Sequence, residues 1–215
     1  LAGVAARATP NIAQLGQRHG IPQIYDAGVL LAASEVIAER GGSDDYVPAF
    51  VDKFTYKDKM VVFPWANSTP VTHYNRDLFS EVGLDPDRTP DTWGELAEYS
   101  RKLTRDTDGD GVIDQWGLNT GSDTAWYIYG MIWQNNGQIL DDALNPLFNQ
   151  ARAVEVFEFW SDLVHEYQGM PPLMHVQAPI DFTIGKTGML FNSIGSHNGF
   201  VQEIGDKFEY GIGFM

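Results

Sequence analysis

Hydrophobic and polar positions along this chain recur in some segments with a helical period and in others with an extended one. The clearest helix signal is a Thr-x-x-Glu capping box at Thr92 and Glu95. Apolar residues then recur on one helical face: Trp93, Leu96, Tyr99 and Leu103. Residues 78–82 predict a second helix, which Gly83 closes in a left-handed conformation. A third is predicted from about residue 153, with an apolar stripe of Val154, Phe157, Trp160, Leu163 and Val164.

Three segments have the character of strands. They are residues 59–64, residues 71–74, and the end of the chain, where Tyr210, Ile212 and Phe214 alternate with glycines. Short apolar runs that alternate with amphipathic helices are typical of α/β proteins. The pattern therefore predicts an α/β fold.

Composition narrows the classes of function. Of 215 residues, 43% are hydrophobic and 20% charged, as in a globular chain of one large or two small domains. The 14 basic residues against 29 acidic ones give a net charge of −15, which argues against nucleic acid or an anionic membrane as partner. The absence of cysteine excludes disulfides, thiol catalysis and Cys-ligated metals.

The two ends of the sequence read as interior segments. The chain opens on Leu1 within a helix-like stretch and stops at Met215 within a strand-like alternation. We therefore expect a fragment of a longer chain. No run approaches the roughly 18 apolar residues of a membrane-spanning helix.

Signatures of enzymes are missing from the sequence. It contains no GxSxG, HExxH, Walker or GxGxxG motif, and its five histidines lack the mutual spacing of metal ligands. We predict that the chain is not an enzyme and uses no catalytic cofactor. The alternative is a glycoside-active enzyme with two carboxylates across a cleft, one of them with a raised pKa.

The sharpest local pattern is an acidic loop. Asp106, Asp108, Asp110 and Asp114 occupy positions 1, 3, 5 and 9 of an EF-hand-type calcium loop, with glycine at position 6. Position 12, where a bidentate Glu belongs, is Gly117. The pattern predicts either a structural Ca²⁺ site or a solvated turn held by bonds from Asp side chains to the backbone. A calcium-dependent adhesion module is a further alternative, which predicts that chelation abolishes function.

Aromatic residues near polar loops are the second chemical signal. Tryptophan faces stack on the C–H faces of sugars and polyols, while amides and hydroxyls bond the hydroxyl groups. Core packing is the competing interpretation, which we expect for Trp133 and Trp160. For Trp65, beside Asn67 and Ser68, both interpretations stay open.

One long segment, residues 63–79, resembles the crossover of family 1 extracellular solute-binding proteins, the capture subunits of ABC importers. It reads Phe-Pro-Trp-Ala-Asn-Ser-Thr-Pro-Val-Thr-His-Tyr-Asn-Arg-Asp-Leu-Phe. Further pieces resemble the family in the same order, at residues 82–86, 90–96, 134–137, 182–189 and 211–215. Because these pieces follow one another across most of the chain, it is identified as a member of this family.

The resemblance implies a two-lobed fold of the type II periplasmic-binding-protein class, with the ligand in a cleft between the lobes. Residues 1–69 would form part of the N-terminal lobe and residues 70–215 an incomplete C-terminal lobe, with a hinge crossover near 69–73. It also implies an extracytoplasmic monomer, either periplasmic or a lipoprotein on the outer face. Its partners would be a small molecule and the importer's permease subunits.

Within the family, residues 64–70 and 192–196 resemble proteins that bind glycerol-3-phosphate. This implies glycerol-3-phosphate or a glycerophosphodiester as ligand, with a sugar or oligosaccharide as the alternative. In these relatives a Glu stands at the position of Gln17, whose amide can still donate to and accept from a polyol. Combined with the aromatic signal, the predicted ligand-binding residues are Gln17, Trp65, Asn67, Ser68, Trp93, Trp126, Ser193, Gly195 and Ser196.

Overall fold

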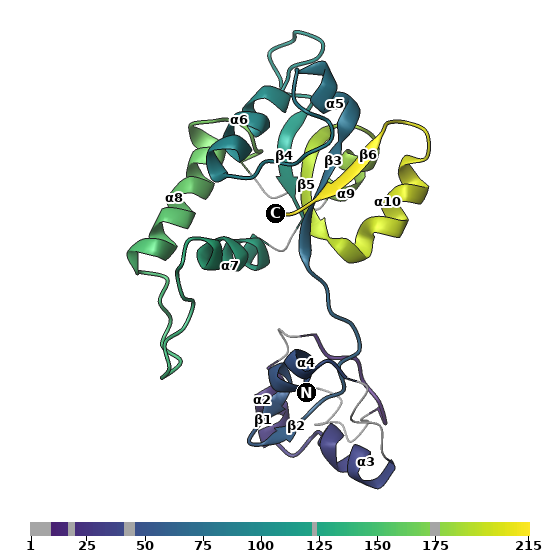
Figure 1. The fold of residues 1–215 in the computed structure, drawn as a ribbon, viewed down its shortest axis with the longest axis vertical. Coiled ribbons are helices and arrows are strands. Elements are labelled where there is room, and N and C mark those ends of the chain that lie inside the picture. The colour runs from purple at the N-terminus through teal and green to yellow at the C-terminus, as the bar shows by residue number, and fades with distance from the viewer. Residues whose placement is uncertain (1–9, 17–19, 41–45, 122–123, 173–176) are drawn as a thin grey trace. The chain divides into compact units, whose positions relative to one another are not determined.

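The computed structural model describes residues 10–16, 20–40, 46–121, 124–172 and 177–215. The chain divides into two compact units, Leu1–Asn67 and Ser68–Met215, and each is described by itself (Figure 1). The division falls two residues before the lobe boundary that the sequence predicts. Within the described residues, no helix combines the length and the apolar character needed to cross a membrane.

The first unit contains short helices and a small hairpin. Their bounds are Ile21–Asp26 (α2), Ala33–Arg40 (α3), Pro48–Lys53 (α4), Thr55–Tyr56 (β1) and Lys59–Met60 (β2). The prediction of a strand over residues 59–64 is therefore wrong beyond Met60. The N–H of Val61 still donates to the carbonyl oxygen of Phe54 at 3.0 Å, but Pro64 has no N–H to donate to a ladder, and the described residues form no strand over 61–64.

The second unit is built on a four-stranded sheet in the order β4-β5-β3-β6. The strands are Pro70–Asn75 (β3), Trp116–Thr120 (β4), Thr187–Ser193 (β5) and Tyr210–Gly213 (β6). Strand β3 runs antiparallel to β5 and β6, whereas β4 and β5 are parallel. The strands predicted over 71–74 and from Tyr210 onward are thus confirmed.

Helices cover both faces of this sheet, so the second unit has three layers (Figure 1). One face, which includes Met189 and Phe191, packs with α6 and α8, and the other, which includes Leu190, packs with α9 and α10. The helices are Arg76–Glu81 (α5), Trp93–Leu103 (α6), Thr124–Gln134 (α7), Ala151–His165 (α8), Ala178–Thr183 (α9), His197–Ile204 (α10) and the 3₁₀ turn Ile194–Ser196 (η2).

Helix α6 begins as the capping box predicts and lies very close to the sheet. The Oγ1 atom of Thr92 accepts a hydrogen bond from the N–H of Glu95 at 3.1 Å. Across from the helix, a Cβ atom at Gly117 of β4 would stand 1.8 Å from the carbonyl oxygen of Ser100. Only glycine fits at this crossing. Gly83 follows α5 with φ of +74°, as predicted.

Helix α8 forms where expected, but the predicted stripe is only partly its buried face. Val154 and Phe157 are 37% and 41% exposed, while Ala153, Val156 and Leu163 are buried. The buried face is displaced by one residue over the first turns because Ala153 and Val156 pack against α7. The core assignment of Trp133 is also wrong, since its side chain is 62% exposed, whereas Trp160 does pack against the core.

Candidate ligand-binding edge of the sheet

Strand β3 begins at the edge of the sheet where β4, β5 and β6 end. The register pairs Pro70, the first residue of β3, with Ser193, the last residue of β5. On the other side of β3, Thr72 pairs with Gly213, the last residue of β6. The last residue of β4, Thr120, lies beside Phe191 near the end of β5. Loops from several strands therefore meet at one edge, as in the binding sites of other α/β folds.

A serine turn lies at this edge. We use this name for Ser68, Ser193 and Gly195. The hydroxyls of Ser68 and Ser193 are in hydrogen-bond contact, and the Oγ atom of Ser193 also accepts from the N–H of Gly195 at 3.0 Å. The N–H of Ile194 donates to the carbonyl oxygen of Thr69 at 3.0 Å and ties the two segments together. Residues 125 positions apart are thus joined.

Ser196 is half-buried and follows the serine turn directly, as the residue that precedes α10. Ser68 is exposed. Of the predicted site residues, Ser193 therefore contacts both Ser68 and Gly195, and Ser196 follows Gly195 in the chain.

Trp93 is half-buried and held at the start of α6. Its ring stacks on Phe159 with centroids 5.0 Å apart, and its Nε1–H donates to Oε1 of Gln134 at 3.4 Å. The amide nitrogen of Gln134 in turn donates to the carbonyl oxygen of Met215 at 2.7 Å, just beyond β6. Trp126 is also half-buried and packs against the core beside Tyr127. Phe159 covers one face of the Trp93 ring.

The remaining predicted residues belong to the first unit. Trp65 is 83% exposed and Asn67 is also exposed, so neither is a core residue of that unit. Gln17 lies outside the described residues.

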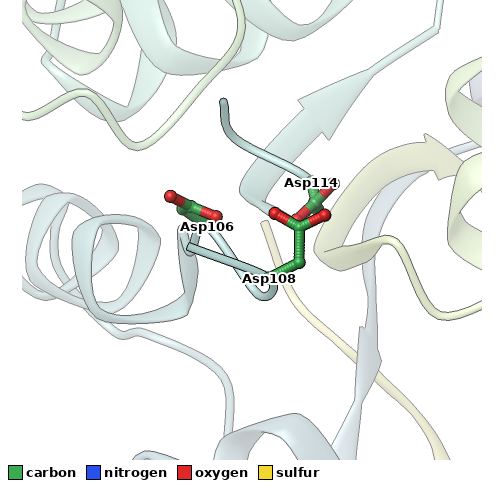
Figure 2. A group of neighbouring side chains, drawn as sticks. All are labelled: Asp106, Asp108 and Asp114. Atoms are coloured by element: carbon green, nitrogen blue, oxygen red, sulfur yellow. The ribbon is translucent and has the colours of Figure 1, made fainter. Parts of the chain in front are cut away.

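The acidic loop brings together three of its four predicted ligands. Carboxylate oxygens of Asp106, Asp108 and Asp114 lie within 4.8 Å of one another (Figure 2). Asp110 is not in this group, and its side chain instead accepts from the N–H of Val112 at 2.8 Å.

Backbone N–H groups also bind the carboxylates of this loop. Asp106 accepts from Gly109 and Gly111 at 2.7 and 2.8 Å, and Asp114 accepts twice from Thr107. The N–H groups of Gly111 and Gly109 lower the pKa of Asp106, and the hydroxyl and N–H of Thr107 lower that of Asp114. These bonds are those of a self-supporting turn, so Ca²⁺ binding stays a prediction.

A buried histidine behind the serine turn was missed by the sequence analysis. His73 is fully buried in β3, and its Nε2 atom lies 3.1 Å from the carbonyl oxygen of Ser193. Its Nδ1 atom lies 2.6 Å from the hydroxyl of Tyr210, and burial lowers the pKa of His73 to about 4. The spacing of metal ligands does not reveal such a histidine, whereas a polar residue inside an apolar strand is itself a signal.

Comparison with known protein families identifies the chain. A family model described as "Bacterial extracellular solute-binding protein" matches residues 3–214. The chain belongs to this family. Its members named below are binding proteins, which agrees with the prediction of a non-enzyme.

Two curated relatives of the chain are also binding proteins. The chain is 30% identical to an sn-glycerol-3-phosphate-binding periplasmic protein of Brucella abortus, over 92% of the chain and 48% of that protein. It is 29% identical to the protein of the same name in Salmonella paratyphi A, over 100% of the chain and 50% of that protein. The chain thus spans about half the length of the curated relatives it matches.

The fold is that of type II solute-binding proteins, as the resemblance implied. A solute-binding protein of Thermotoga lettingae, solved with α-D-tagatose, matches 98% of the chain and 55% of that structure, with a TM-score of 0.84 at 20% identity. UgpB of Mycobacterium tuberculosis, solved with glycerophosphocholine, matches 88% of the chain and 48% of that structure, with a TM-score of 0.75 at 23% identity.

Proposed function

We propose that this chain is part of the substrate-binding component of an ABC importer and captures a glycerol phosphate. The ligand would be glycerol-3-phosphate or a glycerophosphodiester. The observation that carries the proposal is the serine turn, in which two hydroxyls from distant segments meet at the edge of the sheet. The curated relatives, named for binding sn-glycerol-3-phosphate, support the class of ligand.

Capture needs no covalent chemistry. The hydroxyls of Ser68 and Ser193 can each donate and accept, which suits the hydroxyl groups of a polyol. The face of Trp93 away from Phe159 offers an apolar surface for the carbon chain. Gln17, Asn67 and Trp65 would contribute from the first unit. The net charge of −15 does not attract an anion over distance, so phosphate recognition has to come from local donors.

The lobes of the proposed binding protein would be residues 1–69 and 70–215, with the hinge at 69–73. The division of the chain into units at Asn67 and Ser68 supports this assignment. A ligand that contacts both lobes favours the closed state by its differential affinity for the two states. The permease would then recognise the closed monomer outside the cytoplasm. The binding protein itself would be either free in the periplasm or anchored as a lipoprotein to the outer face of the membrane.

A sugar is the second candidate ligand. It is favoured by the match to the Thermotoga lettingae protein, which was solved with α-D-tagatose. Hydroxyls, amides and tryptophan faces suit a sugar ring as well as a glycerol chain.

The test is a tryptophan-fluorescence titration of the full-length protein. The panel is sn-glycerol-3-phosphate, glycerophosphocholine, glycerol, α-D-tagatose and maltotriose. We expect saturation by a phosphate ester at micromolar concentration and no response to the sugars. Saturation by a sugar alone contradicts the proposed ligand class and retains the family. Turnover of any panel member contradicts the proposal that the protein only binds.

A further inference from the structure

His73 lies at the centre of a hydrogen-bonded chain on the face of the sheet that α9 and α10 cover. Its side chain is 0% exposed, and its ring meets those of Phe182 and Phe200, with centroids 6.3 and 4.9 Å away. Both ring nitrogens have partners despite this apolar setting. They are the hydroxyl of Tyr210 at 2.6 Å and the carbonyl oxygen of Ser193 at 3.1 Å.

The chemistry of these partners fixes the direction of every bond. The carbonyl oxygen of Ser193 can only accept, so Nε2 of His73 carries the proton and donates. Nδ1 of the neutral ring then accepts from the hydroxyl of Tyr210. The Tyr210 oxygen is left free to accept from Nδ1–H of His197, 3.2 Å away at the exposed start of α10. The carbonyl of Ser193 thereby selects the Nε2–H tautomer of His73, and the hydroxyl of Tyr210, which can donate or accept, donates to Nδ1.

The carbonyl oxygen that accepts the hydrogen bond from His73 belongs to Ser193, a residue of the serine turn. Ser193 is the last residue of β5, and its side chain accepts from Gly195 and contacts the hydroxyl of Ser68. The backbone of Ser193 is therefore held from the sheet side by His73, while its hydroxyl points to the other segments of the turn. Losing the bond from His73 would leave the carbonyl of Ser193 without this donor and remove one of the bonds that hold the end of β5.

We propose that His73 is a positioning residue of the ligand site, which holds the serine turn in its binding geometry through Nε2. The inference rests on the proposed function in one respect, namely that Ser193 contacts the ligand. Burial of the ring favours its neutral form, and the hydroxyl of Tyr210 satisfies Nδ1 on the side away from Ser193.

Two substitutions separate the two bonds of His73. In His73→Gln the amide nitrogen can replace Nε2 and keep the bond to Ser193, while the bond to Tyr210 is lost. In His73→Asn the shorter side chain can replace Nδ1 and keep the bond to Tyr210, while Ser193 is released. For sn-glycerol-3-phosphate we expect calorimetry to show affinity at least about tenfold weaker in the Asn variant, and within about threefold of the parent in the Gln variant. Equal losses would overturn the proposal.

A second readout does not depend on any ligand. Amide hydrogen exchange at Ile194, whose N–H donates to Thr69, reports the closure of the turn. We expect exchange about tenfold faster in the Asn variant and unchanged in the Gln variant; equal exchange in the two variants contradicts the inference. If the parent binds no panel compound, the proposed function fails, and exchange still decides the role of His73.

A third measurement needs no variant at all. Nitrogen-15 NMR of the parent should show His73 protonated at Nε2 and unprotonated at Nδ1 at neutral pH. The opposite tautomer, or a charged ring, would overturn the inference even if both variants failed to fold.

Discussion

Lowering the pH below 6.5 should destabilise the second unit through His73. The ring is fully buried, and burial lowers its pKa from the ordinary 6.5 to about 4. In the range between these values the unfolded chain binds a proton that the folded chain does not. Stability is therefore complete above about pH 6.5 and is lost as the pH falls toward 4.

The two pKa values of His73 set the size of this effect. At about 1.4 kcal/mol for each pH unit that separates 6.5 from 4, the full loss is roughly 3–4 kcal/mol. About 2 kcal/mol of it should be lost between neutral pH and about pH 4.5. That is a substantial part of the roughly 5–15 kcal/mol by which a typical domain is stable.

Urea denaturation of the parent and of the His73→Gln variant at several pH values measures this effect. Carboxylates with lowered pKa, such as those of Asp106 and Asp114, also lose stabilising bonds in acid. They are present in both proteins, so the difference between the two pH curves isolates His73. Between neutral pH and about pH 4.5, the free energy of unfolding should fall by about 2 kcal/mol less in the variant than in the parent. Parallel curves would refute the reasoning.

Three further predictions concern packing, metal and ligand. Gly117→Ala places a Cβ atom 1.8 Å from a backbone oxygen of α6 and should lower the free energy of unfolding by about 3 kcal/mol in urea denaturation. The control Gly199→Ala, where a Cβ atom meets nothing within 4 Å, should be neutral or stabilising, and equal stabilities of the two variants would contradict the close crossing. Asp108→Ala should lower the melting temperature in millimolar calcium and leave ligand affinity unchanged, and identical melting curves for variant and parent would rule out a structural calcium site. Trp93→Leu should weaken sn-glycerol-3-phosphate binding about tenfold in calorimetry, with the exposed Trp133→Leu as matched control; the same affinity in both would remove Trp93 from the site.

Local signals explain which elements could be predicted from the sequence. The capping box at Thr92 and the left-handed Gly83 are decided by neighbouring residues, so the predicted helices form there. The face of α8 depends on what packs against it. Val154 and Phe157 are as apolar as the buried Val156, and periodicity alone could not tell which of them meets α7.

The candidate site depended on contacts between distant segments. Ser68 and Ser193 are 125 residues apart, and no spacing rule brings them together. The resemblance to a family suggested both, because it carries information about the fold. His73 was missed because its partners, Tyr210 and the carbonyl of Ser193, meet it only through the register of β3 with its neighbours.

The central claim is that the serine turn binds a solute. Calorimetric titration of the full-length protein with sn-glycerol-3-phosphate tests it most directly when the parent is compared with Ser193→Ala and Ser80→Ala. Ser80 is an exposed serine on α5 whose hydroxyl bonds only its own helix among the described contacts, so it is the matched control. We predict saturable binding by the parent and by Ser80→Ala, and binding at least about tenfold weaker for Ser193→Ala. Equal affinity in all three proteins would contradict the claim.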